Sequence, residues 1–473
     1  MTLRDLMGNG APDVEVTGLA YSSRSVTPGT LFFCVPGFRA DGHDFAPDAV
    51  ERGAVALVCE RPLALGVPEI VVPDVRAAMS PAAARFHGHP TEEVAVVGIT
   101  GTNGKTTTAY LVRHVLEAAG RPCGLLGTVK RVVGGVDQEV ERTTPEAIDL
   151  QATFRSMADA GDRACAMEVS SHAIELGRIA GIRFASRVFT NLTQDHLDFH
   201  DTMEAYFAAK RRLFDTPGSA VFNADDRHGR RLAAEFGGVT FAIDHEADVR
   251  ARDVRFDLAG STFVCEAASE SVEVSVGLPG VFNVQNALAA LAAAGTLGLP
   301  LADAAASLAT FDRVPGRFES VDEGQDFGLL VDYAHTPDSL ENVLRAARGL
   351  TKGHLHVVFG AGGDRDRAKR PLMGDVARRL ADRLIVTSDN PRSEDPEAII
   401  EAVMEGAGPG AERETDRRRA IETAVRSAGP GDVVVVAGKG HEQGQEFEDG
   451  RKEPFDDVQA AREALRARLG ARG

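Results

Sequence analysis

The sequence predicts an α/β protein with three domains, from its length, its alternation of elements and two breaks in that alternation. Its 473 residues correspond to about three domains at ~150 residues each. Strand-like apolar runs alternate with helix-like segments, as expected for mainly parallel sheets covered by helices. The pattern changes at Glu93 and again at 314–316. We therefore expect a small N-terminal α/β domain over residues 1–93, a central domain with a mainly parallel sheet over 94–314, and a Rossmann-like, doubly wound C-terminal domain over 315–473.

Short apolar runs define the elements of the first two domains. Runs at 30–35 and 54–58, separated by Pro and Gly, predict strands of the small N-terminal unit. The central domain opens with a strand at 94–100, a Gly-rich turn and a helix at 106–119. Its further strands are predicted at 164–169, 187–192 and 220–223.

The C-terminal third repeats the alternation. Apolar runs predict strands at 329–332, 354–359, 384–387 and 432–437, and helices at 340–349, 373–382 and 396–405. This order is typical of a doubly wound domain.

Composition narrows the classes of partner. The formal net charge is −18, which argues against a nucleic-acid groove or a membrane-surface site, because both need basic surfaces. The five cysteines lie far apart without a CxxC pair, so neither a zinc site nor a disulfide framework is indicated. No apolar run reaches the length of a membrane span. We expect a cytoplasmic, monomeric protein without membrane insertion.

The turn after the strand at 94–100 has the composition of a phosphate-binding loop. It comprises Gly101, Thr102, Asn103, Gly104, Lys105, Thr106 and Thr107. Glycines let backbone N–H groups approach phosphate oxygens, and the following helix N-terminus favours anions. Lys105 would face the outer phosphates, and Thr106 offers a hydroxyl for Mg²⁺. The spacing departs from GxxxxGK[ST], and a Gly-rich turn with a chance lysine is the less favoured alternative.

Four motifs in order resemble those of the Mur ligase family. They are TGTNGKTT at 100–107, MEVSSH at 167–172, NLTQDHLDFH at 191–200 and DYAHTP at 332–337. The resemblance implies an N-terminal domain for a UDP-linked substrate, a central ATP-binding domain and a C-terminal amino-acid-binding domain. It also implies that a substrate carboxylate attacks ATP to give an acyl phosphate, which an amine then converts to an amide.

The resemblance assigns catalytic and metal roles. It makes Lys105, Lys210 and His196 catalytic, and Thr106, Glu168, His196 and Lys210 ligands of Mg²⁺. Lys210 would carry a CO₂-derived carbamate, although alone it looks like a solvated lysine on a helix. The remaining ATP contacts implied are Asn283, Arg317 and Asp332; the amides of Asn283 and Asn286 could instead cap a helix.

Two further sets of residues concern the other substrates. Asp389, Asn390, Pro391 and Arg392 resemble the motif of Mur ligases that add meso-diaminopimelate, whose distal carboxylate suits a planar guanidinium. A Pro-containing turn with an exposed arginine is the alternative. By resemblance, Arg365, Gly438 and Glu442 complete the diamino-acid site. The UDP-N-acetylmuramoyl-dipeptide would meet two further sets: Thr143, Thr144, Ser170 and Arg178 at its dipeptide, and Ser23, Arg39 and Ala40 at its uridine diphosphate. Alternatives are L-lysine or L-ornithine as acceptor, a folylpolyglutamate-type ligase, and a P-loop ATPase without an acceptor.

Overall fold

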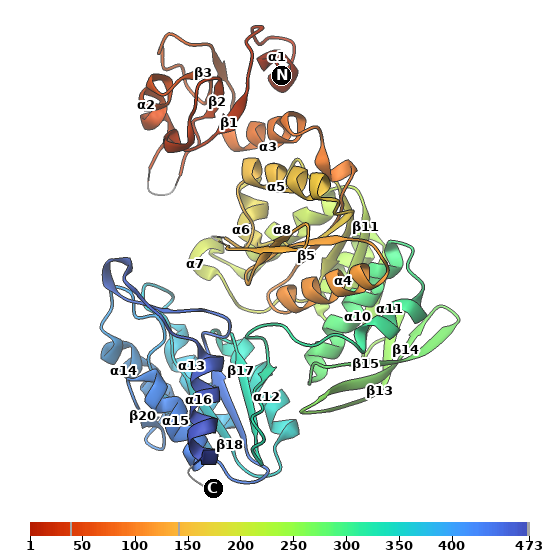
Figure 1. Ribbon diagram of the computed structural model, residues 1–473, viewed down its shortest axis with the longest axis vertical. Helices are drawn as coiled ribbons and strands as arrows, with labels where there is room; N and C mark the ends of the chain where they lie inside the picture. Colours follow the sequence, from red (N-terminus) through yellow and green to blue (C-terminus); the bar gives the residue numbers. More distant parts are fainter. Residues whose placement is uncertain (38–39, 141, 471–473) are drawn as a thin grey trace.

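Three larger sheets follow one another along the long axis of the molecule (Figure 1). The computed structural model describes residues 1–37, 40–140 and 142–470. The mixed α/β fold with a mainly parallel central sheet confirms the predicted fold class. The domain boundaries after residues 93 and 314 stay predictions.

The N-terminal sheet is small and entirely parallel. Its order is β1 (Gly18–Ala20), β2 (Thr30–Phe33), β3 (Ala54–Cys59) and β4 (Glu69–Val71). The helices of this region are α1 (Leu3–Met7), α2 (Ala46–Glu51) and α3 (Val75–Phe86). One face of the sheet shares its core with Ala147 and Ile148 at the start of α5 (Ala147–Ala160), which joins this unit to the central one.

The central sheet has eleven strands in the order β15-β14-β13-β12-β11-β10-β5-β9-β6-β7-β8. The strands are β5 (Ala95–Thr100), β6 (Cys123–Leu126), β7 (Arg131–Val133), β8 (Val136–Gln138), β9 (Ala164–Glu168), β10 (Phe184–Phe189), β11 (Ser219–Asn223), β12 (Val239–Ala242), β13 (Val249–Asp257), β14 (Gly260–Ala267) and β15 (Glu270–Val276). The middle of the sheet is parallel and both ends are antiparallel. The antiparallel ends were not predicted.

Helices cover both faces of the central sheet. One face packs on α4 (Lys105–Ala118), α10 (Val281–Thr296) and α11 (Leu301–Leu308). The other packs on α5, α6 (Ser171–Glu175), α8 (Met203–Arg211) and α9 (Arg227–Phe236), with α7 (Leu197–His200) nearby. The strand predicted at 187–192 ends at Phe189, because the next two residues leave the sheet to bond the phosphate loop.

The C-terminal sheet is doubly wound. Its order is β16 (Glu319–Ser320), β17 (Gly328–Asp332), β21 (Val433–Ala437), β18 (Leu355–Phe359), β19 (Arg383–Val386) and β20 (Glu412–Arg413), antiparallel only at β16. Helices α12 (Pro337–Leu350), α13 (Lys369–Leu380) and α14 (Pro396–Ala407) cover one face. Helices α15 (Arg417–Ser427) and α16 (Asp457–Gly470) cover the other. A short hairpin, β22 (Gln445–Glu446) and β23 (Lys452–Glu453), follows β21.

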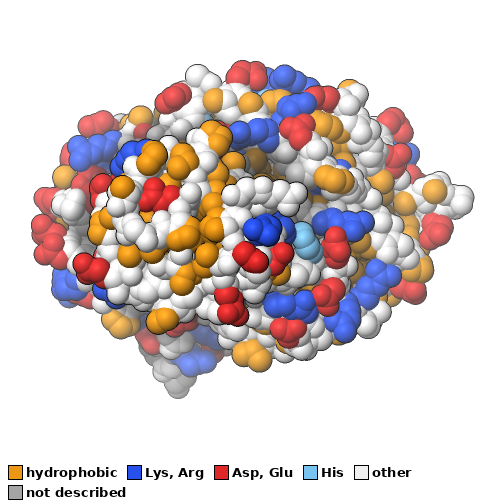
Figure 2. All heavy atoms as spheres, turned by 90° about the horizontal axis from the view of Figure 1, so that it is seen from above, with side chains coloured by type: hydrophobic (Ala, Val, Ile, Leu, Met, Phe, Trp, Pro, Cys, Tyr) orange, Lys and Arg blue, Asp and Glu red, His pale blue; other side chains and the backbone are white. Residues whose placement is uncertain are grey.

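The surface charge is mixed on the face drawn in Figure 2. Acidic and basic side chains are interspersed there around a central hollow, so the net charge of −18 is not gathered into one patch on this face. Within the described residues, no helix is both long and apolar enough to cross a membrane.

Candidate active site

The phosphate loop connects β5 to α4 and depends on two glycines. Gly101 has φ +153° and Gly104 has φ +84°. A Cβ atom on Gly101 would lie 1.9 Å from Thr190 Oγ1, and one on Gly104 would lie 2.4 Å from Asn286 Oδ1. Any larger residue would therefore displace the loop from β10 or from α10.

Two lysines converge on one carbonyl group of this loop. Lys105 Nζ donates to Gly101 O at 3.0 Å and to Thr102 O at 2.8 Å, and Lys210 Nζ donates to Gly101 O at 2.8 Å. Lys210 is only 1% exposed and lies 4.5 Å from the centre of the Tyr206 ring. Burial lowers the pKa of both ammonium groups. The pKa of Lys210 falls well below its ordinary value, chiefly through burial and further through the nearby charge of Lys105. The sequence alone favoured an exposed Lys210, and that expectation was wrong.

Thr106 and Glu168 form an oxygen-rich corner beside the loop. Glu168 Oε2 accepts from Thr106 Oγ1 at 3.0 Å, and Glu168 Oε1 accepts from Thr128 N at 2.7 Å. A hydroxyl and a carboxylate are ligands that Mg²⁺ prefers, together with phosphate oxygens and water. These two residues therefore fit the predicted ion. No group of three His, Cys, Asp or Glu suited to a metal occurs among the described residues.

The contacts described for His196 are with residues other than Thr106 and Glu168. Its backbone is left-handed (φ 54°), and its Nε2 is 3.4 Å from Asp195 Oδ2. Its ring packs edge-on against His172 at 4.9 Å between centres. Burial lowers the pKa of His196 to about 4, so its imidazole is neutral at pH 7. None of the contacts described for His196 is with Glu168.

The residues expected to meet the nucleotide lie around the same loop. Arg317 Nη2 donates to Thr106 Oγ1 at 3.2 Å, and its guanidinium lies 4.4 Å from the centre of the Tyr333 ring. Asp332 accepts from Phe318 N and from Ala334 N, both at 2.7 Å. Burial raises the pKa of Asp332 to about 6.

Asn283 lies inside helix α10 rather than at its cap. The N-cap is Gly280, which has no side-chain cap, so helix capping by Asn283 or Asn286 was the wrong alternative. Asn283 Nδ2 donates to Pro279 O at 2.9 Å, and its Oδ1 accepts from Asn286 Nδ2 at 3.1 Å. Asn286 Oδ1 in turn accepts from Thr108 Oγ1 at 3.3 Å, which connects this pair to α4.

One cavity of about 580 Å³, here called the loop cavity, gathers most of the predicted residues. It is lined by Thr102, Asn103, Gly104, Lys105, Thr106, Thr107, Thr143, Thr144, Glu168, Ser170, Arg178, His196, Lys210, Asn283, Arg317 and Asp332. Gly101 is not part of its lining. The structure thus brings the predicted ATP, metal and dipeptide residues around a single space.

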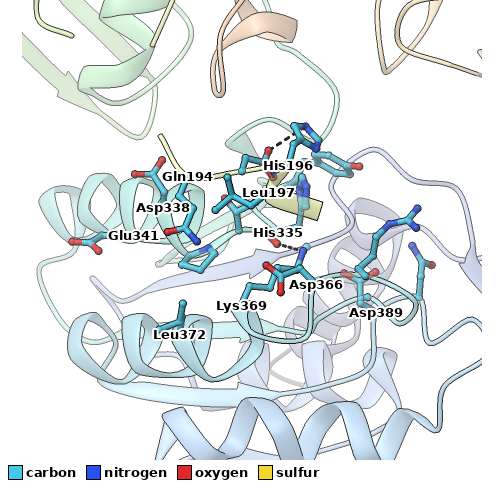
Figure 3. A pocket seen from close by; sticks show the side chains of 18 of the residues that line it. Gln194, His196, Leu197, His335, Asp338, Glu341, Asp366, Lys369, Leu372 and Asp389 are labelled. Atoms are coloured by element: carbon cyan, nitrogen blue, oxygen red, sulfur yellow. Dashed lines mark hydrogen bonds and ion pairs between the residues drawn. The ribbon is translucent and has the colours of Figure 1, made fainter. Parts of the chain in front are cut away.

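A second cavity of about 650 Å³, here called the C-terminal cavity, opens beside it (Figure 3). Its lining includes Arg365, Asp389, Asn390, Arg392, Gly438 and Glu442, while Pro391 is not part of it. Gln194 and His196 face Lys369 and Asp389 across this space in Figure 3. The two cavities share His172, Asp195, His196, Tyr333, His335 and Thr336 in their walls. They are therefore neighbours through a common wall.

A buried lysine that was not predicted, Lys439, holds two side chains that line the C-terminal cavity. Lys439 is 0% exposed, and its Nζ donates to Asn390 Oδ1 at 2.8 Å and to Glu442 Oε2 at 3.0 Å. Asn390 Nδ2 also donates to Glu442 Oε2, at 2.7 Å. Gly438 is required here because a Cβ atom would lie 2.6 Å from Asp389 Oδ2. The charge of Glu442 is thus partly balanced from below. The signal in the sequence was the position of Lys439 between two predicted residues.

One of the predicted dipeptide residues, Arg178, contacts a carboxylate that was not predicted, Glu146. Thr144 Oγ1 donates to Glu168 O at 2.9 Å, and Ser170 N donates to Thr144 Oγ1 at 3.2 Å. Arg178 Nη2 lies 2.8 Å from Glu146 Oε1, which Arg142 and Arg76 also approach, each at 3.1 Å to one of its oxygens. Arg76 belongs to α3 of the N-terminal unit. Glu146 therefore joins the N-terminal and central units.

Those residues predicted to contact the uridine diphosphate that the structure describes do not line either of these two cavities. Ser23 is buried and lines neither cavity, and Ala40 is exposed with its carbonyl accepting from Gly37 N at 2.9 Å. Arg39 lies outside the described residues. A third cavity, of about 450 Å³, extends from Tyr21 to Arg142 and Thr143. It connects the N-terminal unit with the predicted dipeptide residues, but Ser23 is not in its lining.

Fold and site together define a three-part α/β protein in which a phosphate-binding loop faces the sheet ends of a doubly wound C-terminal unit. Three family models match the chain: the Mur ligase family, catalytic domain at residues 15–87, the Mur ligase middle domain at 99–294, and the Mur ligase, glutamate ligase domain at 316–440. The chain belongs to the Mur ligase family.

Similar proteins share a more particular name. The chain is 47% identical to a UDP-N-acetylmuramoyl-L-alanyl-D-glutamate--2,6-diaminopimelate ligase of Geobacillus thermodenitrificans, over 97% of this chain and 96% of the relative. It is 48% identical to a protein of the same name from Streptomyces coelicolor, over 99% and 96%. A solved structure with that name is 34% identical, with a TM-score of 0.72 and 99% of each chain covered.

Proposed function

We propose that this Mur ligase adds meso-2,6-diaminopimelate to the D-glutamate of UDP-N-acetylmuramoyl-L-alanyl-D-glutamate at the expense of ATP. The observation that carries the proposal is the pair of adjoining cavities. One is lined by the phosphate loop, including Lys105, and by Lys210 of α8; the other is lined by Arg392 and Glu442. The names of relatives that match the whole chain at 47–48% identity support the same reaction.

The reaction proceeds through an acyl phosphate. A carboxylate oxygen of D-glutamate attacks the γ-phosphorus of ATP, and ADP leaves. The deprotonated amine of the diamino acid attacks the acyl carbon, and inorganic phosphate leaves as the amide forms. Lys105 and the N–H groups of the loop oppose the negative charge that spreads over the transferred phosphoryl group. The protein contributes position and electrostatics, and no covalent enzyme intermediate is required.

Thr106 and Glu168 would hold Mg²⁺, which supplies further positive charge to the phosphates when bound. The buried Lys210 is suited to carbamate formation, since its lowered pKa favours the neutral amine. The amine nitrogen bonds to the carbon of CO₂ and a proton is released, which converts the neutral amine into an anionic oxygen ligand. His196, neutral at pH 7, is proposed to orient substrate at the common wall.

The C-terminal cavity favours an acceptor with two charged ends. Diaminopimelate carries a distal carboxylate that Arg392 can bind and a distal ammonium that Glu442 can bind. L-Lysine and L-ornithine lack that carboxylate and leave Arg392 without its partner. Arg365, Asp389 and Asn390 would meet the remaining polar groups. Because one chain lines both cavities, we propose that it acts as a monomer, in the cytoplasm where nucleotide-linked precursors are assembled.

The test is phosphate release from ATP with the UDP-linked dipeptide, at saturating Mg²⁺ and bicarbonate, with meso-diaminopimelate, L-lysine or L-ornithine as acceptor. We expect strong preference for meso-diaminopimelate and loss of release in Lys105→Ala. Preference for lysine or ornithine would retain the ligase and reject the specificity. The proposal would be rejected if phosphate release were stimulated only by a folate with glutamate as acceptor. It would also be rejected if phosphate release were the same with every acceptor.

A further inference from the structure

A short segment after β21 lies along the loop that carries Arg392. We call residues 445–447 the flanking segment. Gln445 Nε2 donates to Asp389 O at 2.8 Å, and Glu446 N donates to Asn390 Oδ1 at 3.0 Å. Arg392 N donates to Glu446 O at 2.9 Å, and a parallel bridge joins Arg392 to Phe447. The flanking segment thus fixes the backbone and amides of the predicted diamino-acid loop.

Glu446 also contacts the guanidinium group itself. Arg392 Nε donates to Glu446 Oε2 at 2.9 Å, and Arg392 Nη1 donates to Gly363 O at 2.7 Å. A Cβ atom on Gly362 would lie 3.1 Å from Nη1, so the backbone passes close to the group on that side. An arginine has five N–H donors. Three of those of Arg392 have no partner among the contacts described, and its side chain lines the C-terminal cavity.

From this geometry we infer that Glu446 is a positioning residue that determines acceptor specificity by holding Arg392 with its free donors toward the C-terminal cavity. The inference rests on the proposed function and extends it to a residue outside the cavity lining. An arginine side chain loses much rotamer freedom when it binds a carboxylate. If Glu446 and Gly363 already hold the Arg392 side chain in one conformation, binding of the acceptor does not carry that entropic cost.

Glu446 could instead act by neutralising Arg392, and the two roles predict opposite effects. Neutralisation would weaken the attraction for a substrate carboxylate, so its removal would strengthen diaminopimelate binding. The Arg392 and Glu446 side chains are 20% and 37% exposed, and solvent reduces the attraction between charges at such sites. The hydrogen bond at Nε persists under these conditions, so we assign the positioning role to Glu446.

The experiment compares Glu446→Ala and Glu446→Gln in the full chain, with Glu448→Gln as the matched control. Glu448 is an exposed carboxylate two residues away, so this control removes the same charge without the contact. We expect the KM for meso-diaminopimelate to rise about tenfold in Glu446→Ala, the equivalent of one hydrogen bond to a charged group. The kcat should stay within about twofold. Glu446→Gln keeps an acceptor oxygen and should restore most of the affinity.

Two further readouts separate positioning from a general structural effect. The kcat/KM with L-lysine and the KM for ATP should not change in Glu446→Ala, so the preference for diaminopimelate falls by the same factor. In an Arg392→Ala background, Glu446→Ala should have no further effect. An unchanged or lowered KM for diaminopimelate, an equal loss with lysine, or full additivity with Arg392→Ala would each overturn the inference. A wild-type protein that no acceptor stimulates would instead overturn the proposed function.

Discussion

The buried ion pair between Arg417 and Asp457 gives the strongest stability prediction. Both side chains are 0% exposed, and Arg417 Nε and Nη2 each donate to one Asp457 oxygen at 2.7 Å. Removing one partner of such a pair leaves an uncompensated buried charge. We expect Asp457→Ala to lower the free energy of unfolding of the C-terminal unit by about 3–5 kcal/mol.

The same arginine connects two parts of the predicted diamino-acid site. Its Nη2 donates to Ala437 O at 3.0 Å, and its Nη1 donates to Ser388 O at 3.3 Å. These carbonyls directly precede Gly438 and Asp389. A double variant, Arg417→Met with Asp457→Leu, removes the buried charge and should recover part of the stability. It leaves both carbonyls without their donor, so the KM for meso-diaminopimelate should stay raised.

The assay must report on one unit of the chain, because unfolding of a protein with several units is not two-state. Hydrogen exchange of the amides of β19 and β21 under increasing urea meets this need. Glu463→Ala, on the same helix pair, is the control, since the Arg418–Glu463 pair is 43% and 48% exposed and should contribute at most ~1 kcal/mol. A loss below 1 kcal/mol in Asp457→Ala, or a normal KM in the double variant, would refute the reasoning.

Four shorter predictions concern the site. Lys210→Arg places a permanent cation that cannot form the carbamate, so kcat should fall on the order of 10²-fold and, unlike wild-type activity, be insensitive to bicarbonate. Glu168→Gln should raise the Mg²⁺ concentration for half-maximal activity at least about tenfold. Arg392→Ala should lower kcat/KM for meso-diaminopimelate about 10²-fold, at ~1.5 kcal/mol for each of two charge-assisted hydrogen bonds, and leave the value for L-lysine nearly unchanged. Burial raises the pKa of Asp332 from 3.8 to about 6, so folding favours its protonated form and its contribution to stability is lost as pH rises from about 4 to 6. Asp332→Asn should flatten that part of the pH profile of stability, measured by the same hydrogen exchange under urea.

Local sequence patterns predicted most of the buried parallel strands, but not the parallel strands β1, β4, β6, β12 and β20. The apolar runs that became β5, β9, β17, β18 and β21 are buried from both faces, so they read as continuous hydrophobic stretches. The antiparallel hairpin of β13 and β14 alternates buried and exposed residues and contains charged side chains. Its assignment depends on pairing between strands, which the order of residues along one strand does not reveal.

The residues of the candidate site that were predicted belong to local motifs, and those that were missed depend on partners distant in the sequence. The phosphate loop and the residues at 389–392 are local motifs, and the structure brings them to adjoining cavities. Glu146 was missed because its three arginines come from positions 76, 142 and 178. Glu446 was missed because its partner Arg392 is 54 residues away. Only tertiary folding determines that such residues meet.

The charged side chains that line the two cavities suit ligands of different charge. Around the loop, Lys105 and Arg317 face the space expected to hold polyanionic ATP. The C-terminal cavity instead mixes Asp389 and Glu442 with Arg392, over the buried Lys439, which suits a molecule with charges of both signs. Burial lowers the pKa values of His196 and His335 in the common wall, so these imidazoles add no positive charge at pH 7. An amine arriving from the C-terminal cavity thus meets no repelling cation from these rings as it approaches the acyl phosphate.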